Sequence, residues 1–396
     1  MDNQLTWTEQ GSERSAPWCN EARQKPPKAI VQVDEISADA LLKLAREHTA
    51  VLWRGDFHNA KQVLAALKKR LRKAPNKKAD TLSPAELFHL HRMQQAQQSR
   101  LINMLAVEIA PDFQLDLPRA PEVSAALADV YGEANSEPFL LPLNQLLGFI
   151  GAHEWHKKGV FIPALNGNIH VPFGVFSPLR GEYLDLLAEA PLSPAWRCAF
   201  DIGTGSGVLA ALLARRGIAE ITATDTNPRA LACARANAER LGVAAQIEFA
   251  DTDLFPQDKA DLIVCNPPWL PATPTSAIES ALYDPASAML KGFLAGVREH
   301  LNEGGEAWLI MSDLAEHLGL RQEGELAGWI ADAGLQVDDT LATRPRHAKA
   351  QQADDARGVE RRGGRPGGQL AGGRPVAIVP GTLGHQQVLQ RVGVVK

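Results

Sequence analysis

The stretch Asp201-Ile-Gly-Thr-Gly-Ser-Gly207 decides how this 396-residue chain is organised. It follows the apolar-leaning run Trp196 to Phe200 and opens directly into the helical pattern Val208 to Arg215. Glycine suits a chain that reverses at a strand end, because it adopts positive φ and lets a ligand approach the backbone. A dinucleotide fingerprint needs glycine at its sixth position, where Val208 stands, so that alternative fails on spacing. The stretch predicts a strand, a glycine turn and a helix, with a purely structural turn as the remaining alternative.

Two later strands also end in polar residues. The run Glu220 to Asp225 is a short strand that ends in an acid, 22 residues after Gly203. This is the usual distance for a carboxylate that accepts hydrogen bonds from ribose hydroxyls. A third strand, Asp261 to Cys265, runs into Asn266-Pro-Pro-Trp269. In an open α/β sheet, ligands bind outside the carboxyl ends of the strands, so these residues are candidates for one site.

In the order and spacing of these motifs, roughly Trp155 to Arg346 resembles the class I S-adenosylmethionine-dependent methyltransferases. More narrowly, it resembles their amino-methylating members of the methyltransferase small domain type, which carry an Asn-Pro-Pro-aromatic motif. These include rRNA guanine-N2, adenine-N6 and release-factor glutamine methyltransferases. The resemblance implies a Rossmann-like, doubly wound α/β fold and S-adenosyl-L-methionine as cofactor. The alternation of strands and helices independently predicts a mostly parallel sheet.

The resemblance also assigns the cofactor site. The residues it implies lie in the glycine turn or at strand ends: Asp201, Gly203, Thr204, Gly205, Gly207, Asp225, Asp253 and Asn266. Asp253 matches the family acid that is hydrogen-bonded to the adenine amine, with Asp251 as the fallback and a simple turn acid as the alternative. On the same analogy Arg180 or Glu182 is a candidate for the site. A plain amphipathic helix after Pro178 is an equal alternative.

The residues Asn266, Pro267, Pro268 and Trp269 suit methyl transfer to an amine whose lone pair is delocalised. Two acceptors aimed at its two N–H groups pull the nitrogen toward pyramidal geometry and stabilise the developing positive charge. The Asn266 side chain supplies one acceptor and the Pro267 carbonyl the other, while the prolines fix the backbone. Trp269 offers a face for a planar group, worth on the order of 1 to 3 kcal/mol if it stacks on a base. A simple turn after the strand is the alternative.

The substrate class rests on weaker signals. The segment Lys68 to Lys78 holds seven basic residues in eleven, which indicates either a solvated helix end or a phosphate-contacting patch. We favour nucleic acid, in the first place rRNA, because of this segment and because glutamine-specific relatives more commonly carry Tyr in place of Trp269. The alternative is a glutamine amide of a protein such as a release factor, since an amide presents the same paired donors. A non-catalytic cofactor- or RNA-binding protein is disfavoured because Asn266, which only catalysis requires, is intact.

The composition of the chain limits the classes of protein to which it can belong. The net charge of −5 excludes a polycation, so any nucleic-acid contact has to be a local patch. The 45% hydrophobic and 22% charged content indicates a globular, soluble chain. No apolar run predicts a membrane span, and the first ten residues lack a signal pattern. Four scattered cysteines indicate reduced thiols of a cytoplasmic protein, with neither disulfides nor a metal site expected.

The first half of the chain divides into two patterns. Residues 1–30 carry Gly, Ser, Pro and mixed charges without periodicity, and predict a flexible leader. Residues 31–150 show helical spacing, including the capping box Ser83 to Glu86, and predict a separate helical substrate-recognition domain without strands.

The second half comprises the expected methyltransferase domain, residues 151–346, and a tail, residues 347–396. Within the domain, Asn166-Gly167 predicts a hairpin. The tail holds seven glycines and five arginines between Arg357 and Pro375 and offers no convincing candidate for the antiparallel last strand of the family fold. We interpret it as a frame-shifted or otherwise non-native end, with a flexible Arg-Gly RNA-binding tail as the alternative.

Overall fold

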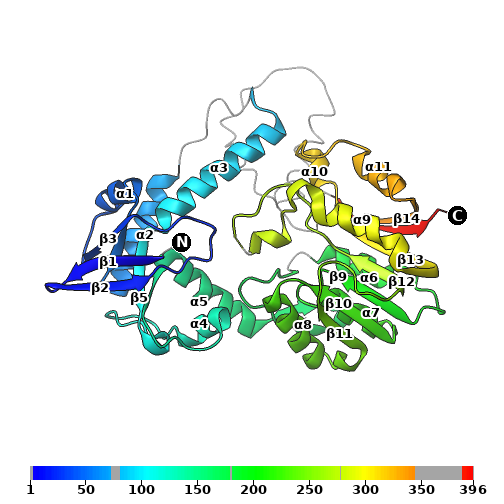
Figure 1. The fold of residues 1–396 in the computed structure, drawn as a ribbon, viewed down its shortest axis with the longest axis horizontal. Helices are drawn as coiled ribbons and strands as arrows, with labels where there is room; N and C mark the ends of the chain where they lie inside the picture. The colour runs from blue at the N-terminus through cyan, green and yellow to red at the C-terminus, as the bar shows by residue number, and fades with distance from the viewer. Residues whose placement is uncertain (1–2, 73–80, 179–180, 277, 344–385, 396) are drawn as a thin grey trace, which may run out of the picture. The chain divides into compact units, whose positions relative to one another are not determined.

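We describe the protein from a computed structural model, which defines residues 3–72, 81–178, 181–276, 278–343 and 386–395. These residues form two compact units, coloured from blue to cyan and from green to red in Figure 1. The N-terminal unit comprises Met1–Asp80, His89–Lys158 and Thr275–Ala277, and the C-terminal unit comprises Thr81–Phe88, Gly159–Pro274 and Ile278–Lys396. No helix in the described ranges combines the length and apolarity needed to cross a bilayer.

The N-terminal unit is built on a four-stranded sheet in the order β3-β4-β5-β6, of which the first three strands run parallel and β6 antiparallel. The strands are β3 (Ala29–Val33), β4 (Thr49–Trp53), β5 (Leu105–Ile109) and β6 (Phe139–Pro142). The expectation of a strand-free domain is wrong. Strands β4, β5 and β6 are almost entirely buried, so they appear in sequence as short apolar runs without the alternation that marks a half-exposed strand.

The first residues are also ordered. A hairpin joins β1 (Gln4–Glu9) to β2 (Ser12–Pro17), and its turn residues Gln10 and Gly11 have φ of 49° and 80°, as a tight hairpin turn requires. The hydrophobic side chains of this hairpin, including Trp7, join the core of the unit. The expectation of a flexible leader over residues 1–30 is therefore wrong.

Helices complete the unit: α1 (Ala38–Arg46), α2 (Phe57–Leu71), α3 (Pro84–Ile102) from His89 onward, α4 (Ser124–Tyr131) and α5 (Leu143–Lys158). The first residues of α3, up to Phe88, belong to the C-terminal unit. The predicted capping box at the start of α3 is present. The Glu86 carboxylate accepts from the Ser83 backbone N–H at 2.8 Å, and the Ser83 hydroxyl accepts from the Glu86 N–H at 3.3 Å.

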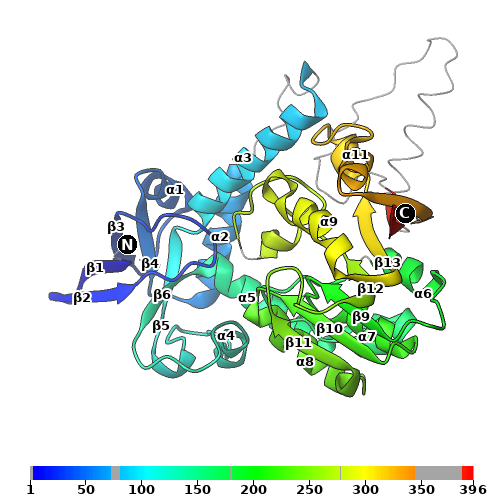
Figure 2. The same cartoon turned by 45° about the vertical axis from the view of Figure 1, so that its right-hand side comes forward.

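The C-terminal unit contains a seven-stranded sheet in the order β11-β10-β9-β12-β13-β15-β14 (Figure 2). The strands are β9 (Cys198–Ile202), β10 (Glu220–Asp225), β11 (Ile247–Asp251), β12 (Ala260–Cys265), β13 (Leu301–Ser312), β14 (Leu335–Thr343) and β15 (Gln387–Val394). β9 to β13 pair in parallel, and β15 pairs antiparallel with both β13 and β14. The predicted doubly wound, mostly parallel α/β sheet is confirmed.

The last strand corrects the interpretation of the tail. β15 lies between β13 and β14, and its Leu389 and Val392 are fully buried. The antiparallel strand that we did not find in the sequence is therefore present within residues 347–396. Residues 344–385, which include the Gly- and Arg-rich stretch, lie outside the described residues.

Alternate strand residues face two helical layers. On one face, Ala199 of β9 packs with α6 (Glu182–Glu189), α7 (Val208–Arg215) and α8 (Pro228–Arg240). On the other, Phe200 packs with α9 (Ala288–His300) and α11 (Glu325–Asp332). Burial on both faces explains why most residues of the central strands β9 and β12 are apolar.

Smaller elements surround this sheet. The hairpin predicted at Asn166-Gly167 is present as β7 (Val160–Ile162) and β8 (Gly167–Ile169), joined by a 3-10 turn that ends at Asn166 in the left-handed region. A short helix, α10 (Leu314–His317), follows β13. All four cysteines are free thiols, two of them buried, which agrees with the absence of disulfides expected from the sequence.

Candidate functional site

The glycine turn between β9 and α7 has the backbone that its sequence predicts. Gly203, Gly205 and Gly207 have φ of 70°, 56° and 80°. The third glycine serves packing, because a Cβ on Gly207 would lie 2.8 Å from Cβ of Ala234 in α8. The first two are partly exposed, and because they lack side chains a ligand can approach the turn backbone at the amino end of α7.

Asp201 supports this turn from beneath. Its side chain is fully buried, and its Oδ2 accepts from the Thr204 hydroxyl at 2.7 Å and from the Ala210 N–H at 3.0 Å. Burial, helped by the charge of Asp225, raises the pKa of the Asp201 carboxyl to about 6. The Asp201 carboxylate and the Thr204 hydroxyl are therefore hydrogen-bonded to each other inside the turn. They contribute to a ligand site by holding the turn in shape.

Asp225 stands beside the turn at the end of β10. Its Oδ2 accepts from the Gly205 N–H and its Oδ1 from the Asn227 N–H, both at 2.9 Å. The Asp225 side chain is half-buried. The two hydrogen bonds orient both of its carboxylate oxygens beside the turn. Because each carboxylate oxygen has a second lone pair, Asp225 remains able to accept from two ligand hydroxyls.

The other two candidate acids follow β11. Asp251 pairs in register with Asp225, and Asp253 lies in the loop just beyond; both are exposed. This loop is tied to β10, because the Thr224 hydroxyl donates to the Leu254 carbonyl at 2.7 Å. Leu254 has a φ of 60°, which turns the chain sharply after Asp253. The sheet thus brings all the predicted acids to one edge.

Asn266 reaches the same edge at the end of β12, whose Cys265 pairs with Ile202 just before the glycine turn. The Trp269 indole N–H donates to Asn266 Oδ1 at 3.0 Å. Pro267 and Pro268 are buried, and Trp269 is half-buried against the hydrophobic side chains of both helical layers. The motif is a rigid corner packed on the sheet.

Tyr183 in α6 is a site residue that sequence reasoning missed. Its hydroxyl is hydrogen-bonded to the Asn266 side chain, and burial raises the pKa of the phenol far above its usual value. This role could not be predicted from the sequence, because an aromatic residue at helical spacing is typical of a core position. Of the neighbouring candidates, Glu182 begins α6 and is half-buried, while Arg180 lies outside the described residues.

The segment after the motif closes one side of the site. Asp284 is buried and accepts from the Met289 and Leu290 N–H groups at 3.0 and 3.1 Å, which fixes the start of α9. Met289 then lies against the glycine turn, where a Cβ on Gly203 would meet its Cε at 2.8 Å. The Met289 side chain therefore borders the turn at Gly203.

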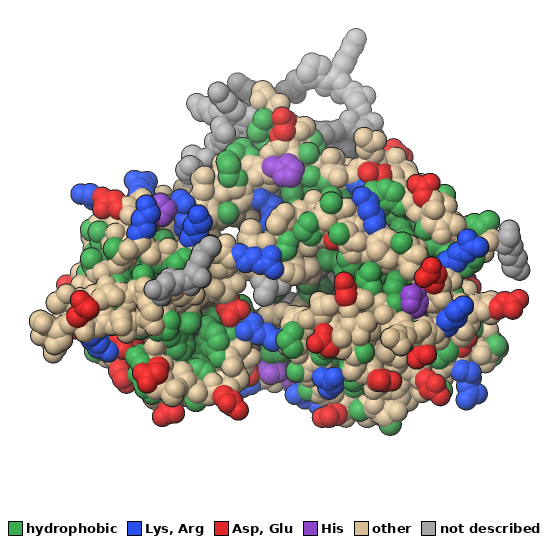
Figure 3. Space-filling model, viewed as in Figure 1, with side chains coloured by type: hydrophobic (Ala, Val, Ile, Leu, Met, Phe, Trp, Pro, Cys, Tyr) green, Lys and Arg blue, Asp and Glu red, His purple; other side chains and the backbone are tan. Residues whose placement is uncertain are grey.

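The basic segment in the N-terminal unit is described only in part, since residues 73–80 lie outside the described ranges. Lys68, Lys69 and Arg70 form the last turn of α2, and Arg70 binds the Asp39 carboxylate at 2.6 and 2.9 Å. On the face in Figure 3, acidic side chains lie among the basic ones.

Comparison with known proteins places this site within a known domain. Residues 169–323 match the family model of the methyltransferase small domain. Over 163 residues the chain is 36% identical to the release factor glutamine methyltransferase of Cereibacter sphaeroides, covering 38% of this chain and 56% of that protein. Over 139 residues it is 34% identical to the ribosomal protein L11 methyltransferase of Symbiobacterium thermophilum, covering 33% and 41%. The chain thus spans about half the length of the curated relatives it matches.

Solved structures give a more distant match. The ribosomal protein L11 methylase of Lactobacillus delbrueckii subsp. bulgaricus covers 58% of this chain and 87% of its own, with a TM-score of 0.36 and 18% sequence identity.

Proposed function

We propose that this chain, which carries a methyltransferase small domain over residues 169–323, is an S-adenosylmethionine-dependent N-methyltransferase that acts on a glutamine side-chain amide of a protein. The observation that carries the proposal is the Asn266 amide, held by Tyr183 and Trp269 at the sheet edge beside the glycine turn.

The sheet edge fits the cofactor in shape and donor chemistry. The turn is bare of side chains at Gly203 and Gly205, and its amides lie at the amino end of α7. Asp225 offers carboxylate oxygens to ribose hydroxyls, and Asp253 is the acid proposed for the adenine amine. When bound, S-adenosylmethionine supplies an electrophilic methyl group on its sulfonium.

The chain's own task is to orient the nucleophile. Asn266 Oδ1 already accepts from Trp269, and its second lone pair is available to one N–H of a substrate amide. The Pro267 carbonyl is the proposed acceptor for the other N–H. Both acceptors are held before substrate binds, because Pro267 and Pro268 restrict the backbone and the indole fixes the side chain. Such preorganised acceptors stabilise the positive charge that develops on the nitrogen.

The relatives favour a protein substrate over rRNA, which we preferred from the sequence. Several are named release factor glutamine methyltransferases, and two are named ribosomal protein L11 methyltransferases. An amide and an exocyclic base amine present the same paired donors, so Asn266 suits either. A release factor is the first candidate substrate, and the N-terminal unit is its proposed binding part.

The test measures transfer of tritiated methyl from S-adenosylmethionine into protein and RNA fractions of a cell extract. The wild-type chain is compared with Asn266→Ala and with a matched control, Asn168→Ala, whose residue is exposed on the β7–β8 hairpin. We expect label in protein that yields N5-methylglutamine after enzymatic digestion. Asn266→Ala should reduce the rate by about 10² to 10³, and Asn168→Ala should leave it unchanged.

Three other outcomes would contradict the proposal. Label that disappears with ribonuclease and depends on Asn266 would assign the activity to RNA and overturn the protein substrate. Cofactor binding without any label in either fraction would point to a non-catalytic binding protein. Label that persists in Asn266→Ala would remove Asn266 from the chemistry.

A further inference from the structure

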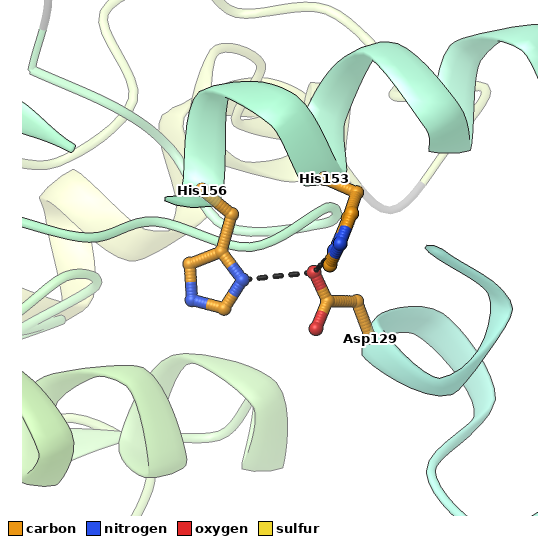
Figure 4. Close-up of side chains that lie close together, drawn as sticks. All are labelled: Asp129, His153 and His156. Atoms are coloured by element: carbon orange, nitrogen blue, oxygen red, sulfur yellow. Dashed lines mark hydrogen bonds and ion pairs between the residues drawn. The ribbon is translucent and has the colours of Figure 1, made fainter. Parts of the chain in front are cut away.

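We propose that the N-terminal unit binds one divalent transition-metal ion, Zn²⁺ in the first place, through Asp129, His153 and His156. This proposal concerns a part of the chain that methyl transfer does not use. Of the residues the structure describes, these three are a group whose ligand atoms all lie within 4.8 Å of one another (Figure 4).

The three side chains converge from two packed helices. Asp129 comes from α4, and the two histidines come from the last two turns of α5. Residues three apart lie on the same face of a helix, so the spacing His-x-x-His places both rings toward α4. The helices are held together by the Tyr131–Phe149 edge contact, with ring centroids 6.0 Å apart. The backbone frame of the site is therefore fixed by hydrophobic packing.

The distances are close to those of a coordinated ion. Asp129 Oδ2 lies 2.6 Å from Nδ1 of His153 and 2.8 Å from Nδ1 of His156. Metal–ligand bonds of about 2.0–2.2 Å in tetrahedral geometry place ligand atoms roughly 3.3 Å apart. Each ring nitrogen therefore needs to move away from Asp129 Oδ2 by only roughly 0.5–0.7 Å to admit the ion, a change within side-chain rotation.

The donor set suits the ion in charge and in number. Two imidazole nitrogens and one carboxylate oxygen are ligands that Zn²⁺ prefers, and three protein ligands leave a fourth position for water. The side chains of Asp129, His153 and His156 are 22%, 17% and 25% exposed, so the ion and this water can reach the site from solvent.

The surrounding charges do not oppose a cation. The site lies near the carboxyl end of α5, where the helix dipole favours positive charge. The two adjacent lysines are engaged elsewhere: Lys157 pairs with Glu154 at 2.7 Å, and Lys158 lies over the Trp155 ring at 5.2 Å. In the metal-free protein, one carboxylate oxygen accepts from two ring N–H groups. When the metal binds, each ring carries its proton on Nε2 instead, so the metal takes the place of both Nδ1 protons and links α4 to α5 through bonds of defined length.

The test uses the full chain, purified without a polyhistidine tag and treated with a chelator. Zn²⁺ alone is titrated and measured by elemental analysis after dialysis, and Co²⁺ alone is titrated as an optical probe. We expect one equivalent per chain, a tetrahedral Co²⁺ absorption spectrum and a rise in the unfolding temperature of the wild-type chain. His153→Asn, His156→Asn and Asp129→Asn should each lower the affinity by at least about tenfold.

The matched control is His317→Asn. His317 also pairs with an aspartate, Asp313, at 3.0 Å, but no third candidate ligand lies with them among the described residues, so its loss should leave metal binding unchanged. Circular dichroism of each variant checks folding, and Asp129→Asn, which keeps the shape of the side chain, provides a folded variant. Substoichiometric binding by the wild-type chain, or equal affinity in wild type and triad variants, would overturn the proposal and leave the triad as a hydrogen-bonded link between two helices.

Discussion

The Trp269 indole N–H donates to Asn266 Oδ1 at 3.0 Å, so the aromatic residue of the motif orients its first residue. We expect Trp269→Phe, which keeps an aromatic ring but loses this donor, to lower kcat/KM. A typical hydrogen bond contributes about 0.5–1.5 kcal/mol, which corresponds to roughly a two- to tenfold loss. Methyl-transfer kinetics measure it, and cofactor affinity should not change.

Trp155→Phe is the matched control for this substitution, because Trp155 is 56% exposed in the N-terminal unit. Tyr183→Phe removes the second partner of Asn266 and should also reduce kcat. Since both residues act through one side chain, the double variant should lose less than the sum of the two single losses in free energy. Strict additivity, or an unchanged rate in Trp269→Phe, would contradict this role.

Asp201 gives the protein a measurable pH dependence. Burial raises the pKa of its carboxyl to about 6 from a reference of 3.8. As pH rises from 4 to 7, the unfolded chain loses this proton first, so the free energy of unfolding falls by about 2 kcal/mol from this group alone. Asp201→Asn keeps an acceptor for Thr204 but cannot ionise. Its free energy of unfolding, relative to wild type, should rise by about that amount between pH 4 and 7 in urea titrations; parallel profiles would refute the shift.

Alanine substitutions at Gly207 and Gly242 separate the stability cost of backbone strain from that of steric overlap. An added Cβ at Gly207 would lie 2.8 and 2.9 Å from Cβ and Cα of Ala234, in addition to the strain of a φ of 80°. Gly242 has a similar φ of 70° with nothing within 4 Å of an added Cβ. Gly242→Ala should therefore cost about 1–2 kcal/mol from strain alone, and Gly207→Ala roughly 1–3 kcal/mol more. Equal losses in denaturant unfolding would mean that α7 and α8 separate without cost.

Leu389 tests whether the last strand is part of the native sheet. Its side chain is fully buried between the helical layers, so Leu389→Ala should cost about 2–5 kcal/mol of stability. Val395→Ala is the control, because Val395 is 48% exposed, and should change stability by no more than about 0.5 kcal/mol. A negligible effect of Leu389→Ala would support the interpretation of the tail as non-native.

The C-terminal sheet could be predicted from the sequence because its candidate site residues lie at the ends of its strands. Gly203, Asp225 and Asn266 each mark the point where a buried strand stops, and the structure brings all three to one edge. Helical spacing and the capping box likewise located α7 and the start of α3. β15 was not predicted because its buried residues include Gln387, which breaks the apolar pattern of a buried strand.

Other features depend on contacts between segments that are distant in sequence. Tyr183 and Asn266 are 83 positions apart, and their hydrogen bond follows from how α6 packs on the sheet. Asp129 and His153 converge only because α4 and α5 pack together. The strands of the N-terminal unit were missed because short apolar runs such as Thr49–Trp53 fit a buried helix as well as a buried strand.

The position of β15 between β13 and β14 sets an order of events during synthesis. β14 pairs with β15 and not with β13, so when residues 335–343 leave the ribosome their partner strand has not yet been made. Until residues 387–394 emerge, the edge of β13 and the apolar side chains that Leu389 and Val392 later cover are open to other chains. The sheet is therefore completed only after residues 387–394 have left the ribosome, and chains in this window expose apolar surface to which a chaperone can bind.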